Sequence, residues 1–388
     1  MGVKGTIIVG GSVAQRPGHG GHTWVFLQYL LGFRRLGWDV LLLDRLESTM
    51  CRDKAGAPCH AEDSIQLSYL RRVMDGFGLG DCYAVSCDGG ERYVGVGRRE
   101  VMEKARRSAL LLNVMGYVND PDVLAAAPRR VFLDIDPGFP QMWRELGQVD
   151  LFAGHDDFVT IGLKVGHEDC HVPTCDLKWV TTPQPVVLEQ WPVREGQLNR
   201  PITSVCTWRG DWGAVTYGGK TYGMRVHEFR KFLSLPRETG HTFELALDIH
   251  PNETNDLALL DSNGWVRTDP REAAGDPNAY RQYVRSGSAE FMVAKNMYVQ
   301  TRGGWFSDRS ACYLATGRPV LAQDTGIRRM FPIGRGLLSF STRDEAAAGI
   351  EEVFRDYRGH ARAARAVAEE YFDSDKVLRR LLDKLGVN

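Results

Sequence analysis

Long apolar segments are missing from this sequence of 388 residues. Apolar runs such as residues 40–43 are far shorter than the roughly 20 residues that a membrane-spanning helix needs. The first residues also lack the charged segment and apolar core of a secretory signal. We therefore expect a soluble, cytoplasmic protein without a membrane span.

An excess of charge of either sign is missing too. The 48 Lys and Arg residues and the 49 Asp and Glu residues give a net charge of -1. Because nucleic-acid-binding domains usually carry a basic surface, we expect no nucleic-acid partner. The eight cysteines form no Cys-x-x-Cys pair, and free thiols are expected in a chain of this size without a secretory signal.

The sequence does have enough apolar residues for more than one core. One hydrophobic core stops growing at about 250–300 residues, so two domains are expected. Strand-length apolar runs alternate with helical patterns in both halves, which predicts two α/β domains. We place an N-terminal domain at residues 1–190, a C-terminal domain at 200–370 and a final helix at 371–388. The weakly patterned residues 186–201 are the predicted linker.

The first half opens with a strand, a loop, a helix and a second strand. Residues 5–10 and 38–44 have the length and apolarity of buried strands. Residues 23–36 have apolar side chains at helical spacing and end at Gly37. This order implies parallel pairing, so we predict a Rossmann-like domain.

The loop before that first helix is rich in glycine, which lets a backbone turn tightly and lets a substrate approach closely. We predict that it lines a ligand cleft through Gly18, His19, Gly20 and Gly21. His22 follows at the head of the helix. A histidine can take up a proton near neutral pH, so His22 is the candidate general base.

The same loop leaves a dinucleotide site open as an alternative. In the glycine pattern of such sites, the third glycine would fall on Thr23, which is a poor fit. Asp44 could act as the acidic residue that binds a ribose. An NAD(P)-dependent oxidoreductase is therefore the second candidate function.

A second glycine-rich segment, residues 300–326, lies in the C-terminal half. It places Ser307, Asp308 and Arg309 at the head of a predicted helix, where free backbone N–H groups suit a pyrophosphate. Asp324, Thr325 and Gly326 follow a buried strand and could hydrogen-bond sugar hydroxyls. Ligands of parallel sheets bind beyond the carboxyl ends of the strands, where both groups are expected.

These motifs resemble those of GT-B glycosyltransferases. Residues 315–322 (ATGRPVLA) match the A-x-G-x-P-V string of their donor-binding half, and residues 18–22 (GHGGH) are similar to a loop of the N-acetylglucosaminyltransferase that completes lipid II. The resemblance implies two Rossmann-like domains facing across a cleft. It also implies a UDP, GDP or dTDP sugar bound by the C-terminal domain and an acceptor near the glycine loop. The final helix would cross back to the N-terminal domain.

Two departures from the family pattern bear on stereochemistry. Gly304 and Cys312 stand where many retaining members carry a pair of glutamates. Gly304-Trp305 is similar instead to the glycine-tryptophan of plant-type inverting members. The resemblance therefore favours an inverting displacement, with Trp305 beside the donor.

Cations are also expected beside the diphosphate. The first loop of the C-terminal domain supplies Arg209, with Lys220 and Arg225 nearby, and Lys295 and Arg309 lie further along. Arginine's planar guanidinium suits phosphate oxygens. With such cations no metal ion is required, and no cofactor is expected.

Paired acidic residues and clustered thiols are weaker signals. Asp134-Ile-Asp136 resembles the metal-binding Asp-x-Asp of another glycosyltransferase fold, but it lies in the opposite half from the expected donor. We expect Asp136 to face the cleft in an acceptor-binding or catalytic role. The His and Cys residues of the segment 167–175 fit no zinc spacing.

The sequence thus predicts a metal-independent hexosyltransferase that acts on a small-molecule acceptor, with a role in specialised-metabolite or antibiotic biosynthesis. The oxidoreductase, a nucleotide-sugar epimerase and a catalytically silent GT-B-like partner protein remain alternatives. The oligomeric state stays open.

Overall fold

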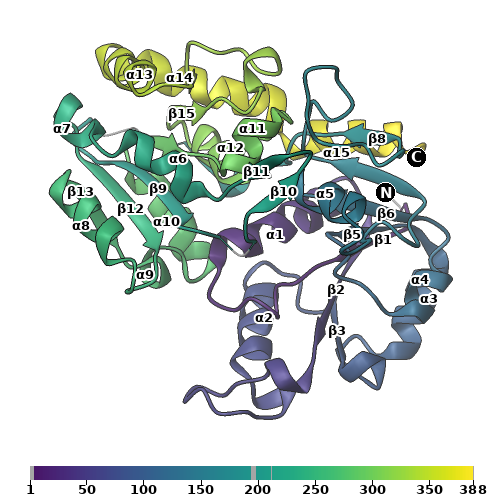
Figure 1. The fold of residues 1–388 in the computed structure, drawn as a ribbon. Coiled ribbons are helices and arrows are strands. Elements are labelled where there is room, and N and C mark those ends of the chain that lie inside the picture. The colour runs from purple at the N-terminus through teal and green to yellow at the C-terminus, as the bar shows by residue number, and fades with distance from the viewer. Residues whose placement is uncertain (1–3, 194–197, 211, 388) are drawn as a thin grey trace.

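The computed structural model describes residues 4–193, 198–210 and 212–387 (Figure 1). Residues 194–197, which belong to the predicted linker, lie outside the described residues. Two parallel sheets, one in each half of the chain, form the framework. The predicted α/β architecture with two Rossmann-like domains is confirmed.

The N-terminal half contains an eight-stranded sheet in the order β4-β3-β2-β1-β5-β6-β7-β8, in which only β4 runs antiparallel to its neighbour. Its strands are β1 (Thr6–Gly10), β2 (Asp39–Leu46), β3 (Tyr83–Cys87), β4 (Arg92–Gly95), β5 (Ser108–Val114), β6 (Arg130–Asp134), β7 (Asp157–Thr160) and β8 (Trp179–Thr181). The helices are α1 (Gly20–Arg35), α2 (Ile65–Gly76), α3 (Arg98–Arg107), α4 (Pro121–Ala126) and α5 (Phe139–Glu145). The strand order reverses direction between β1 and β5.

The C-terminal half contains a parallel six-stranded sheet in the order β13-β12-β9-β14-β15-β16. Its strands are β9 (Ile202–Thr207), β12 (Phe243–Asp248), β13 (Trp265–Thr268), β14 (Ala289–Met292), β15 (Val320–Gln323) and β16 (Leu337–Phe340). The helices are α6 (Arg225–Phe229), α7 (Leu235–Thr239), α8 (Thr254–Ser262), α9 (Pro270–Ala274), α10 (Pro277–Ser286), α11 (Asn296–Thr301), α12 (Asp308–Ala315), α13 (Arg343–Arg355), α14 (Tyr357–Val367) and α15 (Ser374–Lys384). Here the strand order reverses between β9 and β14.

A short hairpin follows β9, where the sequence pattern predicts only a loop and a helix that begins at Tyr222. Its strands are β10 (Val215–Tyr217) and β11 (Lys220–Tyr222), joined by Gly218 and Gly219 with φ of 56° and 75°. Two glycines with positive φ form the tight turn that a two-residue hairpin needs. Beside the hairpin, Trp212 packs edge-on against Trp143 of α5, with ring centroids 5.0 Å apart.

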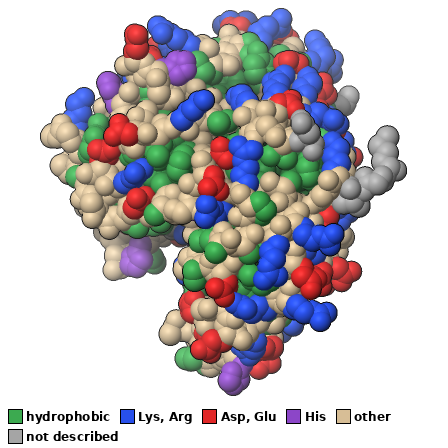
Figure 2. Space-filling view, turned by 90° about the vertical axis from the view of Figure 1, so that its right-hand side faces the viewer, with side chains coloured by type: hydrophobic (Ala, Val, Ile, Leu, Met, Phe, Trp, Pro, Cys, Tyr) green, Lys and Arg blue, Asp and Glu red, His purple; other side chains and the backbone are tan. Residues whose placement is uncertain are grey.

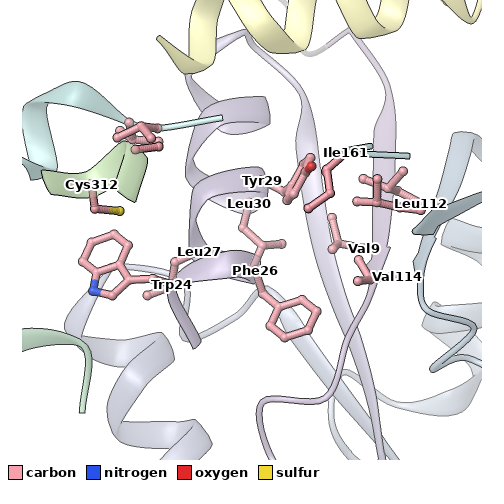
Figure 3. Close-up of a cluster of buried hydrophobic side chains, with 14 of the residues drawn as sticks. Val9, Trp24, Phe26, Leu27, Tyr29, Leu30, Leu112, Val114, Ile161 and Cys312 are labelled. Carbon is pink, nitrogen blue, oxygen red and sulfur yellow. The ribbon is translucent and has the colours of Figure 1, made fainter. Parts of the chain in front are cut away.

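Helix α1 is buried on nearly all sides because both halves of the chain pack against it. Phe26 and Leu30 point towards Val9 and Val114 of the N-terminal sheet, while Trp24 points towards Cys312 on α12 (Figure 3). One continuous apolar cluster therefore includes side chains from both domains.

The chain returns to the N-terminal half at its end, drawn in yellow in Figure 1. Leu378 of α15 lies against Gly32 of α1, where an added Cβ would come within 2.4 Å of its Cδ1 atom. The partly exposed side chains of Arg35 and Asp375 form an ion pair at 3.0 Å beside this contact. Of the helices that the structure describes, none combines the length and the apolarity needed to cross a bilayer.

Candidate functional site

The carboxyl edges of the two sheets face each other, and the loops that follow the strands are in contact. Asp136, after β6, pairs with Lys295, after β14, at 2.9 Å. After β7, the backbone N–H of Lys164 donates to the carbonyl oxygen of Gly303 at 2.9 Å. Since ligands of parallel sheets bind at these edges, the predicted site residues lie where the fold places a ligand.

His22 lies in the first turn of α1, above the point where the N-terminal strand order reverses. Its Nε2 is 2.9 Å from the Oγ of Ser12, in the loop after β1. Its ring contacts Phe26 and Tyr117 edge-on, with centroids 5.1 Å and 6.5 Å away. The imidazole is half-buried, so it combines a fixed orientation with access from outside.

The glycines before His22 allow the two halves to approach closely. A Cβ on Gly20 would lie 2.2 Å from the carbonyl oxygen of Asp276, and one on Gly21 would lie 2.9 Å from the ring of Tyr280. Trp24 donates its indole N–H to the carbonyl oxygen of Pro277 at 2.8 Å in the same region. Because glycine has no Cβ, the N-terminus of α1 can lie directly against the N-terminus of α10. Gly18 and His19 are both exposed at the start of this loop.

Asp136 reaches from the N-terminal domain into contact with the C-terminal one. Besides its ion pair with Lys295, its Oδ1 accepts a hydrogen bond from the hydroxyl of Tyr298 on α11. Burial opposes ionisation of Asp136, but Lys295, Tyr298 and the Trp212 indole outweigh it and lower the pKa of the carboxyl. Asp136 is therefore a carboxylate held by donors from the opposite half.

Asp134 faces the protein interior instead of the cleft. It is fully buried, and its Oδ2 accepts hydrogen bonds from Gln141 and Thr160 at 2.8 Å each. Its Oδ1 accepts the backbone N–H of Asp136 at 2.9 Å. Burial raises the pKa of Asp134 to about 7, although these hydrogen bonds oppose the shift. The resemblance of residues 134–136 to a paired metal motif does not extend to the geometry.

The two predicted donor loops form one unit. The backbone N–H of Gly304 donates to the carbonyl oxygen of Thr325 at 2.8 Å, and the Thr325 hydroxyl donates to the carbonyl oxygen of Trp305. Asp324 accepts the N–H of Gly326 at 2.9 Å and lies 3.5 Å from Arg328. Residues around 304, between α11 and α12, are thus brought together with those around 325, which follow β15.

Several predicted donor contacts have other partners. Trp305 stacks on Tyr298, with ring centroids 4.2 Å apart, so one face of its ring is covered by protein rather than open to a sugar. Arg309 is buried and its Nε lies 2.5 Å from Glu290. Arg209 pairs with Glu253, with 2.9 Å between Nη2 and Oε2. The partners of these three residues depend on how distant segments pack together, which local sequence patterns do not show.

Some of the remaining predicted donor residues are buried or half-buried, and others are exposed. Ser307 is buried at the N-terminus of α12, and Asp308, half-buried, begins that helix. Burial raises the pKa of Asp308, while Arg309 beside it opposes the shift. Lys220 is exposed on β11 of the hairpin. Among the cations predicted for the diphosphate, Lys295 thus lies at the contact between the two sheet edges.

Two residues at this contact, Lys164 and Tyr298, are absent from the predicted donor site, whereas Arg225 was named as a cation near it. Arg225 begins α6, is 7% exposed and donates from Nη1 to a backbone carbonyl oxygen at 3.4 Å. Burial lowers its pKa, and within the described part of the chain its Nε has no hydrogen-bond partner. Tyr298 holds Asp136, and Lys164 lies 3.0 Å from a Cβ added to Gly304. Arg225 was found because it lies near the first loop of the C-terminal domain, whereas Lys164 and Tyr298 leave no local signal in the sequence.

The space between α1 and α12 is small in this structure. A cavity of about 10 Å³ is bounded there by Trp24, Gln28, Asp308 and Cys312, among others. Ligand pockets for small molecules usually measure about 300–1,000 Å³. The two halves are therefore closed on each other at this point.

No protein-family model and no curated protein matches this chain, whereas solved structures do. Anabaena HepE in complex with UDP-glucose has a TM-score of 0.59 at 11% identity, over 98% of this chain and 99% of that one. An alpha-glucosyltransferase in complex with UDP and a 13-mer DNA gives 0.56 at 11% identity over 100% of both chains. AviGT4, a glycosyltransferase involved in avilamycin A biosynthesis, gives 0.54 at 12% identity over 98% and 96%.

At these identities the likeness establishes the fold, and this chain has the GT-B fold along its whole length. One of the similar structures contains DNA, so the expected absence of a nucleic-acid partner stays a prediction from charge. On the face shown in Figure 2, Lys and Arg side chains are interspersed with Asp and Glu.

Proposed function

We propose that this protein is a glycosyltransferase, which moves a sugar from a nucleotide-sugar held by the C-terminal half to a hydroxyl of a small molecule held by the N-terminal half. One observation carries the proposal: the carboxyl edges of two parallel sheets meet, with cations on one side and His22 on the other. Both groups lie at the points where strand order reverses, the usual ligand sites of such sheets. UDP-glucose, which Anabaena HepE contains, is the first donor to test.

The C-terminal side offers groups suited to a diphosphate. Lys295 follows β14, and Arg225 begins α6 after the hairpin that follows the neighbouring strand β9. Arg225 is a buried cation whose Nε has no hydrogen-bond partner among the described residues. The N-terminus of α12 adds backbone N–H groups and the positive end of the helix dipole. These groups would stabilise the leaving diphosphate without a metal ion or other cofactor.

The proposed reaction is a single inverting displacement. His22 takes the proton of an acceptor hydroxyl, whose oxygen attacks the anomeric carbon of the donor sugar. The bond between that carbon and the diphosphate breaks, and the diphosphate leaves with the electron pair. Asp324 and Thr325 are proposed to hold sugar hydroxyls. A place in specialised-metabolite biosynthesis is part of the proposal, and the likeness to AviGT4, which is involved in avilamycin A biosynthesis, supports it.

The oxidoreductase alternative is weakened by Asp44. A ribose-binding carboxylate must be reachable, but Asp44 is 2% exposed. It accepts the N–H of Ala14 at 2.6 Å and the side-chain amide of Gln15 at 2.9 Å. Its carboxylate is therefore used to fix the loop before α1.

Thermal shifts with UDP, GDP, dTDP and NAD(P) test the proposal, since a ligand that binds the folded state raises its melting temperature. We expect one nucleoside diphosphate to stabilise the protein and the matching nucleotide-sugar to release that diphosphate on turnover. Stabilisation by NAD(P) alone would overturn the proposal. Binding of the nucleotide without any release of diphosphate, with acceptor or with water, would instead indicate a silent partner protein.

A further inference from the structure

The carboxylate of Asp136 occupies a set of donors that belong to the opposite domain. Its Oδ1 lies 2.9 Å from Nζ of Lys295 and accepts the Tyr298 hydroxyl, and both of these residues follow β14. Trp212, from the loop after β9, helps to lower the pKa of this carboxyl. An ammonium and a phenol thus converge on one carboxylate oxygen.

The position of these donors is where a ligand of the C-terminal sheet would bind. Strands β9 and β14 are neighbours, and the strand order reverses between them. Ligands of open parallel sheets lie beyond the carboxyl ends of the strands at such a reversal. The cation Arg225 begins the helix on the β9 side and is 7% exposed. The local charge therefore favours an anion.

Asp136 is presented to these donors by a rigid loop. Asp134 accepts its backbone N–H at 2.9 Å, and Gln141, which donates to Asp134, also accepts the N–H of Gly138 at 2.8 Å. The side chains of Lys295 and Asp136 are 15% and 23% exposed. A half-buried ion pair with its geometry fixed from both sides competes effectively with an incoming anion.

We propose that Lys295 and Tyr298 form an oxyanion site for the diphosphate of the donor, and that Asp136 fills this site while no donor is bound. This inference rests on the proposed function and adds a step to it. A phosphoryl oxygen takes the place of Oδ1 of Asp136, so donor binding releases the carboxylate. Because Asp136 belongs to the N-terminal domain, the exchange also removes a contact that holds the two halves together.

Because Asp136 and the donor compete for one site, the proposal predicts measurable changes in affinity. In the wild-type protein, part of the binding free energy of the donor is used to displace Asp136. Asp136→Asn keeps the size of the side chain but removes its charge, so it should bind inorganic pyrophosphate roughly tenfold more tightly than the wild type. Lys295→Met should bind pyrophosphate more weakly than the wild type, and Asp136→Asn should give no gain in that background.

The test is isothermal titration calorimetry of the full chain with inorganic pyrophosphate, which does not depend on the nucleotide base, and then with UDP, GDP and dTDP. Asp39→Asn is the matched control. Asp39 pairs with Lys104 at 2.7 Å at the opposite edge of the sheet, with similar exposure, so its loss changes the net charge equally. We expect its affinity to stay within about twofold of the wild type. Melting curves verify that each variant is folded, and Asp136→Ser is a second variant.

The outcomes separate this inference from the proposed function. Equal or weaker pyrophosphate binding by both Asp136 variants overturns the competition, and unchanged binding by Lys295→Met overturns the site. An equal gain in Asp39→Asn assigns the effect to net charge and also overturns the inference. If neither pyrophosphate nor any of the nucleoside diphosphates binds to the wild type or to Asp136→Asn, the proposed function itself fails.

Discussion

The guanidinium of Arg309 lies inside the C-terminal domain against Glu290, with 2.5 Å between Nε and Oε1. Glu290 is fully buried on β14, and Arg309 also donates to the carbonyl oxygen of Val205 at 2.7 Å. Removing one partner of a buried pair leaves the other charge without compensation. Arg309→Met should therefore lower the free energy of unfolding by about 3–5 kcal/mol, measured by urea denaturation.

Arg209 is the matched control because it was predicted for the same diphosphate but pairs on the surface. Its side chain is 45% exposed and its partner is Glu253. Exposed pairs contribute at most about 1 kcal/mol, so Arg209→Met should melt close to the wild type. Equal losses of stability in the two variants would contradict the distinction between them. A loss of pyrophosphate affinity in Arg209→Met alone would support a donor role for this arginine.

Replacing His22 should lower the turnover rate and leave donor binding unchanged. It belongs to the N-terminal domain, whereas the cations proposed for the diphosphate belong to the C-terminal domain. His22→Ala should lower kcat by about 100-fold to 10,000-fold, the usual contribution of a general base. The dissociation constant of the nucleoside diphosphate should stay within about twofold of the wild type.

Ser12 provides the companion test for His22, since its Oγ lies 2.9 Å from Nε2 of the ring. Ser12→Ala removes a hydrogen bond that orients the imidazole but leaves the base in place. The loss in kcat should therefore be smaller than in His22→Ala, about tenfold or less. Intact turnover in His22→Ala would show that the base assignment is wrong and would leave the fold and the donor site unaffected.

The framework of the fold could be predicted because it depends on local periodicity. Residues 5–10 and 38–44 match β1 and β2 to within two residues, and the string at 315–322 spans the end of α12 and the start of β15. Alternation of buried strands and helices is a short-range pattern, and the sequence of both domains shows it. The hairpin of β10 and β11 was missed although Gly218-Gly219 between two β-branched and aromatic runs is a hairpin signal.

The partners of the charged residues could not be predicted, because they come from elements far apart in the chain. Asp136 and Lys295 are separated by 159 positions, and Arg209 and Glu253 by 44. Whether a cation faces a ligand or a carboxylate of the protein depends on packing between layers, which no local pattern reports. Tyr298 was missed for the same reason, since its role at Asp136 appears only when the halves are placed together.

Asp134 should make stability depend on pH. The pKa of its carboxyl is about 7 in the folded protein and about 4 in an unfolded chain. At pH values between these two pKa values, the Asp134 carboxyl is protonated in the folded state and ionised in the unfolded state. The free energy of unfolding therefore falls as the pH rises through this range. Asp134→Asn lacks this contribution. From pH 4.5 to 8 the variant should gain about 2–4 kcal/mol relative to the wild type in urea denaturation.

The titration of Asp44 does not affect this comparison between the wild type and Asp134→Asn. Burial raises its pKa to about 6, opposed by hydrogen bonds from Gln15 and Ala14, so it acts in the same direction. Both proteins contain Asp44, and its effect cancels in the difference between them. Parallel stability curves for the wild type and Asp134→Asn over this pH range would show that Asp134 titrates normally.

Replacing Gly20 by alanine should prevent the two halves from closing on each other. The added Cβ would lie 2.2 Å from the carbonyl oxygen of Asp276 and 2.8 Å from that of Ala274, and backbone atoms cannot rotate away as a flexible side chain can. The head of α1 must then move off α10, which separates His22 from the C-terminal domain. We expect Gly20→Ala to lose about 1–3 kcal/mol of stability. It should also lose most of its kcat and show a larger radius of gyration in X-ray scattering.

Gly76→Ala is the control for this substitution. Gly76 ends α2, and no atom of the described residues lies within 4 Å of a Cβ added there. Alanine is favoured over glycine in helices by up to about 1 kcal/mol, so this variant should be as stable as the wild type or slightly more stable. Its radius of gyration and kcat should match those of the wild type. If Gly20→Ala behaved like Gly76→Ala, close contact between α1 and α10 would not be needed for turnover, and the glycine loop would have to act on the acceptor alone.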